Sequence, residues 1–120
     1  MRLIHVLTLC LLALWPGRSE ATTSLGFDGG GYSISMEIGH DVEAVVASLT
    51  VRTPRAPKGV FLYGNFTTEV FDVPGQKLLI RFEQHDEDAE PGSFTLSVEG
   101  EEATLRIDGE TIVAPFHWFM

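Results

Sequence analysis

The chain of 120 residues carries 17 acidic side chains against 8 lysines and arginines, a formal net charge of −9 at pH 7. An acidic excess of this size argues against nucleic-acid binding and against adhesion to anionic lipid, because both need a basic protein surface. It suits a cationic partner, a metal ion or simply solubility.

The first residues have the three-part layout of a cleavable secretory signal. A positive start is followed by an apolar run over 3–15, and small residues at Ser19 and Ala21 match a cleavage site after Ala21. The apolar run is shorter than the roughly 20 residues that a membrane-spanning helix needs. The sequence therefore predicts a signal peptide over 1–21, a domain over 22–120, a periplasmic or secreted location and no stable membrane insertion.

The single cysteine, Cys10, falls inside the predicted signal peptide, so the remaining domain would contain no disulfide. Small domains secreted into oxidising fluids usually carry several disulfides, and their absence favours a bacterial periplasm. Removal of the predicted signal peptide would leave a net charge of about −10.

Alternation of apolar and polar residues predicts a series of half-buried strands. The alternating runs are 32–38, 44–52, 77–84, 93–99, 103–108 and 111–118. In the run over 44–52, the alternation places Val45 on the same face as Leu49 and Val51. Pro115, late in the last run, predicts an edge position or a bulge, because proline donates no ladder hydrogen bond.

Two further apolar stretches depart from simple alternation. The continuous run over 60–63 predicts a short strand that is buried on both faces. The stretch over 66–73 changes phase between Val70 and Phe71, and such a slip indicates a β-bulge.

Turn residues separate these runs, and no segment has a convincing helical period. Asp108-Gly109 between two alternating runs is among the strongest hairpin signals, because both residues tolerate a positive φ. The sequence predicts an all-β protein: a single small antiparallel β-sandwich or closed β-barrel of about 7–9 short strands, with a C-terminal four-stranded meander over 77–118.

A search for catalytic motifs finds no nucleophile elbow, phosphate-binding loop or zinc-protease motif. Three histidines remain after the predicted signal peptide, His40, His85 and His117, each in a different segment. We therefore expect a protein that is not an enzyme and has no cofactor.

The densest charged segment is the acidic run over 83–90, which contains Asp86, Glu87, Asp88 and one histidine. It lacks the spaced ligands and the internal glycine of a helix–loop–helix calcium site, so we predict no metal site. A solvated connection between strands is one interpretation. Electrostatic contact with a basic partner is another, with Asp86, Glu87 and Asp88 steering the encounter.

Two other segments are candidates for partner binding. Arg52, Arg55 and Lys58 lie close together around two prolines, which stiffen the loop and reduce the entropy lost on binding. Phe116 and Trp118 belong to an aromatic C-terminal segment, where we expect one face in the core and one face free to anchor a partner.

These features favour an exported, non-enzymatic binding protein, most simply an inhibitor or immunity protein for a secreted cell-wall-degrading enzyme. The expected partner is a basic protein such as a secreted hydrolase. The alternatives are a periplasmic β-barrel that handles a small molecule or metal and a structural subunit of an envelope complex. The sequence does not determine the oligomeric state.

Overall fold

The computed structural model describes residues 24–40 and 44–119. The predicted signal peptide and its cleavage site lie outside these ranges. All regular secondary structure in the described residues is β-strand: β1 Ser24–Gly29, β2 Tyr32–His40, β3 Ala44–Thr53, β4 Ala56–Leu62, β5 Thr67–Asp72, β6 Lys77–Phe82, β7 Phe94–Glu99, β8 Glu102–Ile107 and β9 Glu110–Phe119. No helix within the described residues is long and apolar enough to cross a membrane.

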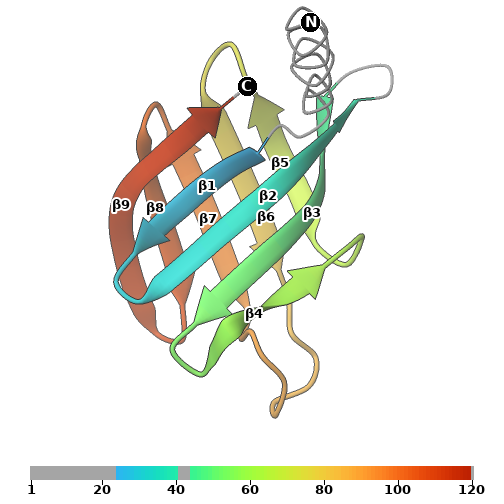
Figure 1. The fold of residues 1–120 in the computed structure, drawn as a ribbon, viewed down its shortest axis with the longest axis vertical. Helices are drawn as coiled ribbons and strands as arrows, with labels where there is room; N and C mark the ends of the chain where they lie inside the picture. The colour runs from blue at the N-terminus through green and yellow to red at the C-terminus, as the bar shows by residue number, and fades with distance from the viewer. Residues whose placement is uncertain (1–23, 41–43, 120) are drawn as a thin grey trace, which may run out of the picture.

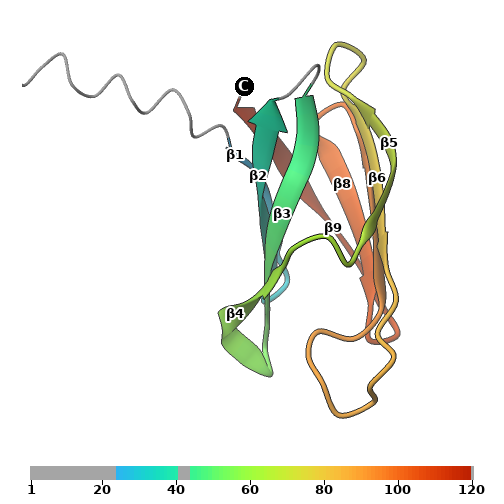
Figure 2. The ribbon, with the colours of Figure 1, turned by 90° about the vertical axis from the view of Figure 1, so that its right-hand side faces the viewer.

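The nine strands form one antiparallel sheet in the order β4-β3-β2-β1-β9-β8-β7-β6-β5 (Figure 1). The sheet curls into a half-barrel, so that β1, β2 and β3 face β5, β6, β7 and β8 across the interior (Figure 2). The all-β, antiparallel prediction is confirmed. The two outermost strands, β4 and β5, are consecutive in the chain but are not hydrogen-bonded to each other in the described structure.

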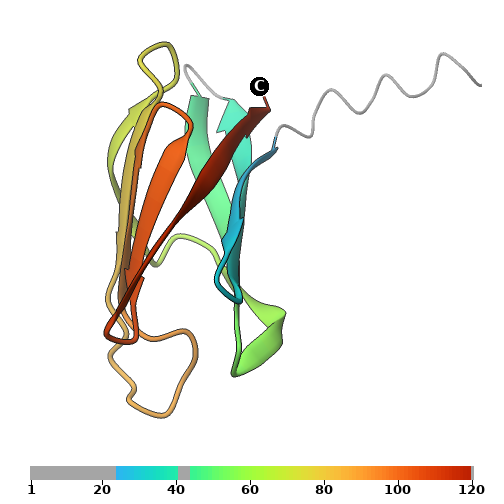
Figure 3. The ribbon, with the colours of Figure 1, turned by 90° about the vertical axis from the view of Figure 1, so that its left-hand side faces the viewer.

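Strand β9 belongs to both layers and crosses between them (Figure 3). Its first part pairs with β8 from Glu110 to Pro115, whereas residues 116–119 pair with β1. The Phe116 N–H donates to the Glu101 carbonyl on the β8 side at 2.8 Å, so the Pro115 nitrogen faces the β1 side. Pairing with β1 stops at that position, since proline has no N–H to offer. Pro115 therefore marks a local edge within a strand at the centre of the sheet.

Tight turns fix the register of the β8–β9 and β1–β2 hairpins. Asp108 and Gly109 both have positive φ, 53° and 74°, as a two-residue turn of the favoured hairpin type requires. The β1–β2 hairpin packs tightly against β9: a Cβ added to Gly29 would lie 2.7 Å from the Ala114 Cβ. The glycine at position 29 thus allows a backbone approach that any side chain would obstruct.

The hydrophobic core fills the space between the two layers, and most inward residues are those that the alternation predicts. On the first layer Ile34, Met36 and Ile38 are buried. On the second layer the buried positions are Leu78, Ile80, Phe82, Phe94, Leu96, Val98, Ala103, Leu105 and Ile107. Tyr32 closes the core next to the β8–β9 turn, where its hydroxyl donates to Asp108 Oδ2 at 3.3 Å.

The predicted alternation is wrong at the start of β3. Val45 is exposed, whereas Val46 packs against the core. The register explains the error: Glu37 pairs with Ser48, but the next residue, Ile38, pairs with Val46. Ala47 is therefore an extra residue, and a bulge at this point moves every earlier side chain to the opposite face.

The bulge predicted in β5 is present, but it lies earlier than expected. Thr68 pairs with Ile80 and Val70 pairs with Leu79, which leaves Glu69 as the extra residue. Because β5 is an outermost strand, this bulge and its charged residue disturb an edge that could otherwise pair with another chain.

Candidate functional site

An open groove of about 890 Å³ lies between strand β4 and the loop that joins β6 to β7. We call it the β4 groove. Its lining includes Phe61, Phe66, Phe82, Glu69, Arg81, Glu83, His85, Asp86 and Glu90. The groove occurs where β4 and β5 are not hydrogen-bonded to each other and the chain crosses from one layer to the other (Figure 2). The open side of the half-barrel thus produces a cavity with aromatic and charged walls.

The acidic loop over 83–90 is held in shape by its own hydrogen bonds. The Gln84 N–H donates to Ser93 Oγ at 2.8 Å, and its side-chain amide donates to the Pro91 carbonyl at 2.9 Å. Asp86 N–H donates to the Gln84 side-chain oxygen at 3.2 Å, and Asp88 N–H donates to Asp86 Oδ1 at 3.0 Å. Gln84, a residue that sequence reasoning did not select, therefore organises the loop.

The acidic loop contacts the basic hairpin between β3 and β4. Arg55 Nη1 lies 3.6 Å from Glu90 Oε2, and the buried Thr53 hydroxyl donates to Glu90 Oε1 at 3.3 Å. The same hydroxyl accepts a hydrogen bond from the Ala56 N–H at 3.1 Å, which closes the hairpin turn. Two segments that the sequence presents as separate candidates are thus joined at one end of the molecule.

A second ion pair lies at the other side of the groove. Arg81 Nε is 2.6 Å from Glu69 Oε2, and both side chains are partly exposed. Pairing of this kind between exposed groups contributes little to stability. Its effect here is to hold the bulged Glu69 beside β6, where both side chains line the groove.

Two exposed aromatic rings project from the end of β4 and the residue beyond it. Phe61 and Tyr63 are 62% and 72% exposed, and their rings stack with centroids 6.3 Å apart and planes 8° apart. The prediction that the run over 60–63 is buried on both faces is wrong. Strand β4 is an outermost strand of the described sheet, and only Leu62 of this run is fully buried. The nearby Pro57 is the sequence signal for an edge strand.

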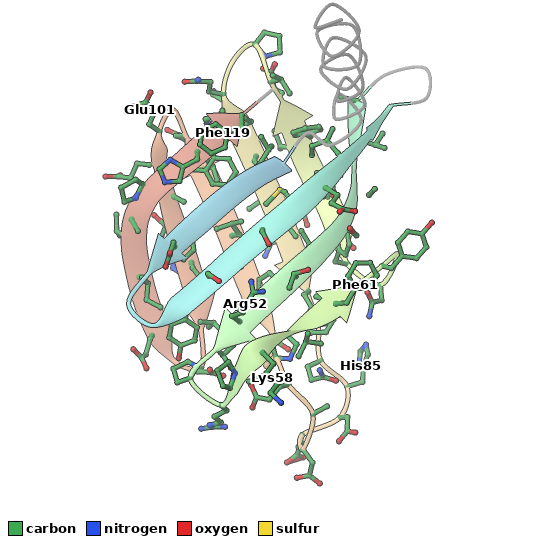
Figure 4. The ribbon with its side chains drawn as sticks, in the orientation of Figure 1. Arg52, Lys58, Phe61, His85, Glu101 and Phe119 are labelled. Atoms are coloured by element: carbon green, nitrogen blue, oxygen red, sulfur yellow. The ribbon has the colours of Figure 1, made fainter. Side chains whose placement is uncertain are left out.

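The predicted site residues are divided between the two ends of the molecule (Figure 4). Arg52 and Lys58 lie on the β3–β4 hairpin at the end where His85 and the acidic loop are found, and Phe61 lies close by on β4. Phe119 and Glu101 mark the opposite end. Asp86 lines the groove, whereas Glu87 and Asp88 are exposed loop residues outside its lining.

At the opposite end, Phe116 is only 2% exposed and packs in the core. Trp118 is half-buried: its ring meets Phe116 edge-on at 4.9 Å, and its indole N–H donates to the Gly100 carbonyl at 2.6 Å. The surface aromatic is Phe119, which is 67% exposed and stacks on His117 at 5.5 Å. Partner binding by Phe116 and Trp118 stays a prediction, but in the described fold both side chains contribute to packing.

Outside the groove, burial raises the pKa of Tyr32 above its ordinary value of 10.0, and the nearby charges of Glu110 and Asp108 act in the same direction. Among the residues that the structure describes, no three His, Cys, Asp or Glu side chains gather in a way that could hold a metal ion. The groove can therefore offer carboxylates, one arginine and aromatic faces to a bound group.

Comparison with known proteins adds no relative: no family model matches the chain, and neither a curated protein nor a solved structure is significantly similar to it.

Proposed function

We propose that this chain is an exported, non-enzymatic binding protein that attaches to a basic protein and neutralises it. The observation that carries the proposal is a groove lined by the acidic loop and the exposed Phe61. Tyr63 stacks on Phe61, and the basic hairpin contacts the acidic loop through Arg55 and Glu90. Protein-binding surfaces are enriched in aromatic anchors and have a polar rim around them. The net charge of −9 would speed the encounter with a cationic protein.

A secreted cell-wall-degrading enzyme is the partner that we favour. Such an enzyme acts on an anionic wall, and a basic surface aids its approach. The chain would then be an inhibitor or immunity protein in the periplasm or outside the cell, as the predicted signal peptide over 1–21 also suggests. A rigid sheet that carries preformed loops suits inhibition, because little conformational entropy is lost on binding.

The finer architecture expected from the sequence belongs to the same proposal. Closure into a β-sandwich or barrel, and a C-terminal four-stranded meander over 77–118, stay predictions. Both would provide the rigid framework that an inhibitor needs, since loops on a fixed scaffold keep their positions when a partner binds.

A small-molecule carrier is the second candidate function. The groove volume of about 890 Å³ falls within the range of roughly 300–1,000 Å³ that small ligands occupy. Carriers usually bind in mostly apolar pockets, whereas Glu69, Glu83, Asp86 and Glu90 line this one together with Arg81. The charged lining favours the protein-binding function.

The test is an inhibition titration. Secreted muramidases, amidases and peptidases with a basic net charge would digest a peptidoglycan suspension while the purified protein is added. We expect stoichiometric loss of activity for at least one enzyme, with the association rate falling as salt rises. Full activity of the whole panel at a large excess of the protein would contradict the inhibitor function. Saturable binding of an apolar dye in the groove would then favour the carrier.

A further inference from the structure

The groove carboxylates differ in whether they already have an ion-pair partner. In the described part of the chain, Glu69 is paired with Arg81 and Glu90 with Arg55, whereas Glu83 and Asp86 form no ion pair. Asp86 accepts the Asp88 N–H through Oδ1, which fixes the orientation of its carboxylate. The groove therefore presents two carboxylates to a cation, and one of them is held in place.

The aromatic pair favours a guanidinium group as the cation that binds in the groove. Phe61 lines the groove and stacks almost parallel with Tyr63. A guanidinium group is planar, stacks on aromatic faces and forms two parallel hydrogen bonds with a carboxylate. A lysine ammonium ion is compact and more strongly hydrated, so the same surroundings would hold it less well.

The position of the groove limits how the arginine can be presented. Val60, Phe61 and Leu62 line the groove and also belong to an outermost strand of the sheet. An extended peptide can lie along such an edge, since the outer backbone groups of an edge strand have no strand partner. Pro57 and Lys58 disfavour pairing along the first part of β4, which leaves the short segment over 60–62.

We propose that the β4 groove binds an arginine side chain presented by an extended segment of a basic protein. The guanidinium stacks against Phe61 and pairs with Asp86 and Glu83. This inference rests on the proposed function in one respect, namely that the partner is a protein. It adds the chemical group that the partner inserts and the residues that receive it.

The experiment measures binding of a short fluorescein-labelled oligoarginine peptide to the purified protein by fluorescence anisotropy at low salt. An oligolysine peptide of equal length is the comparison. We expect the oligoarginine peptide to bind more tightly, by about threefold or more, because stacking and bidentate pairing favour guanidinium. Equal affinity for the two peptides, or no binding of either, would overturn the inference.

Matched variants separate the groove from net charge. The double variant Glu83→Gln/Asp86→Asn removes two charges and keeps the side-chain oxygen that accepts the Asp88 N–H. Glu101→Gln/Glu102→Gln removes the same charge at the opposite end, where Glu101 is drawn in Figure 4. We expect about a tenfold loss of affinity in the groove variant and less than about twofold in the control. Equal losses would show attraction by net charge alone and would overturn the inference.

The aromatic face has its own pair of variants. Phe61→Ala should weaken oligoarginine binding by about two- to fivefold, as expected for loss of an exposed cation–π contact. Phe119→Ala removes an equally exposed ring at the opposite end and should leave the affinity unchanged. Unchanged thermal midpoints in both variants would show that the fold is intact. Loss of affinity in both, or in neither, would contradict a site at Phe61.

Failure of this inference is distinguishable from failure of the proposed function. If enzymes are inhibited but oligoarginine binds without preference, the protein neutralises its partner through another surface and the groove assignment is wrong. If oligoarginine binds as expected but no basic enzyme is inhibited, the groove assignment holds and the inhibitor function is wrong.

Discussion

Replacement of Phe116 by alanine should destabilise the protein by about 3–5 kcal/mol. The side chain is 2% exposed, and the change removes both its buried area and its edge-on contact with Trp118 at 4.9 Å. Burial of a phenylalanine contributes roughly 1.5–3 kcal/mol, an aromatic pair adds about 0.5–1.5 kcal/mol, and the cavity left behind adds a further cost. A small domain has only about 5–15 kcal/mol of stability in total.

The assay is urea denaturation followed by circular dichroism, with Phe119→Ala as the control. Phe119 is 67% exposed, so its replacement should change the free energy of unfolding by no more than about 0.5 kcal/mol. If Phe116→Ala is unfolded without urea, Phe116→Leu should give a measurable, smaller loss. A loss below about 1 kcal/mol for Phe116→Ala, or equal losses in the two alanine variants, would refute the assignment of Phe116 to the core.

Three other outcomes test the fold. Gly29→Ala should lower the free energy of unfolding by about 1–3 kcal/mol, because the new Cβ would lie 2.7 Å from the Ala114 Cβ. Gly26→Ala on the same strand is the control: its Cβ would make only an ordinary contact at 3.6 Å, and the same urea assay should show no change. Gly109→Val should lower the thermal midpoint, because a β-branched residue resists a φ of 74°; an unchanged midpoint would place the hairpin elsewhere. Because the pKa of Tyr32 is raised above 10.0 in the folded protein, the unfolded chain loses the Tyr32 proton at a lower pH than the folded protein does, and stability should decline above about pH 10. Tyr32→Phe should remove this contribution to the decline, together with the late phase of the tyrosinate absorbance titration. A titration with no late phase would contradict the raised pKa.

The inward faces of the C-terminal strands follow from local sequence. In β6, β7 and β8 every second residue is apolar, and the tight turns that join β7 to β8 and β8 to β9 fix the register of those pairs. A side chain in such a strand has only two possible directions, so strict alternation is enough to choose between them. The Asp108-Gly109 turn was also predictable, because few residues accept positive φ at two successive positions.

Features that depend on distant strands were not predictable in this way. The bulge at Ala47 is visible only in the pairing of β3 with β2, and it reverses the direction of Val45. Phe61 is exposed on an outermost strand of the described sheet, a position that the composition of the run over 60–63 does not reveal. Continuous apolar runs are ambiguous, since they are typical of buried strands and of binding edges alike.

The candidate site was predictable in its components but not in its assembly. Charge density alone selects the acidic loop and the basic hairpin, yet the contact between Arg55 and Glu90 depends on how the two layers face each other. The aromatic segment near Phe116 is conspicuous in sequence, but much of it contributes to packing. Gln84 carries no sequence signal, because an amide that organises a loop is recognised only by its hydrogen bonds.

The sharing of β9 between the two layers also affects the order in which parts of the molecule fold. Each layer contains hairpins between neighbours in the chain, which form quickly once their residues are free. Strand pairing between the layers forms only when residues 116–119 pair with β1, at the other end of the described chain. Pairing of β9 with β1 joins the strands that are farthest apart in the described sequence, so we expect it to be the slowest step of folding.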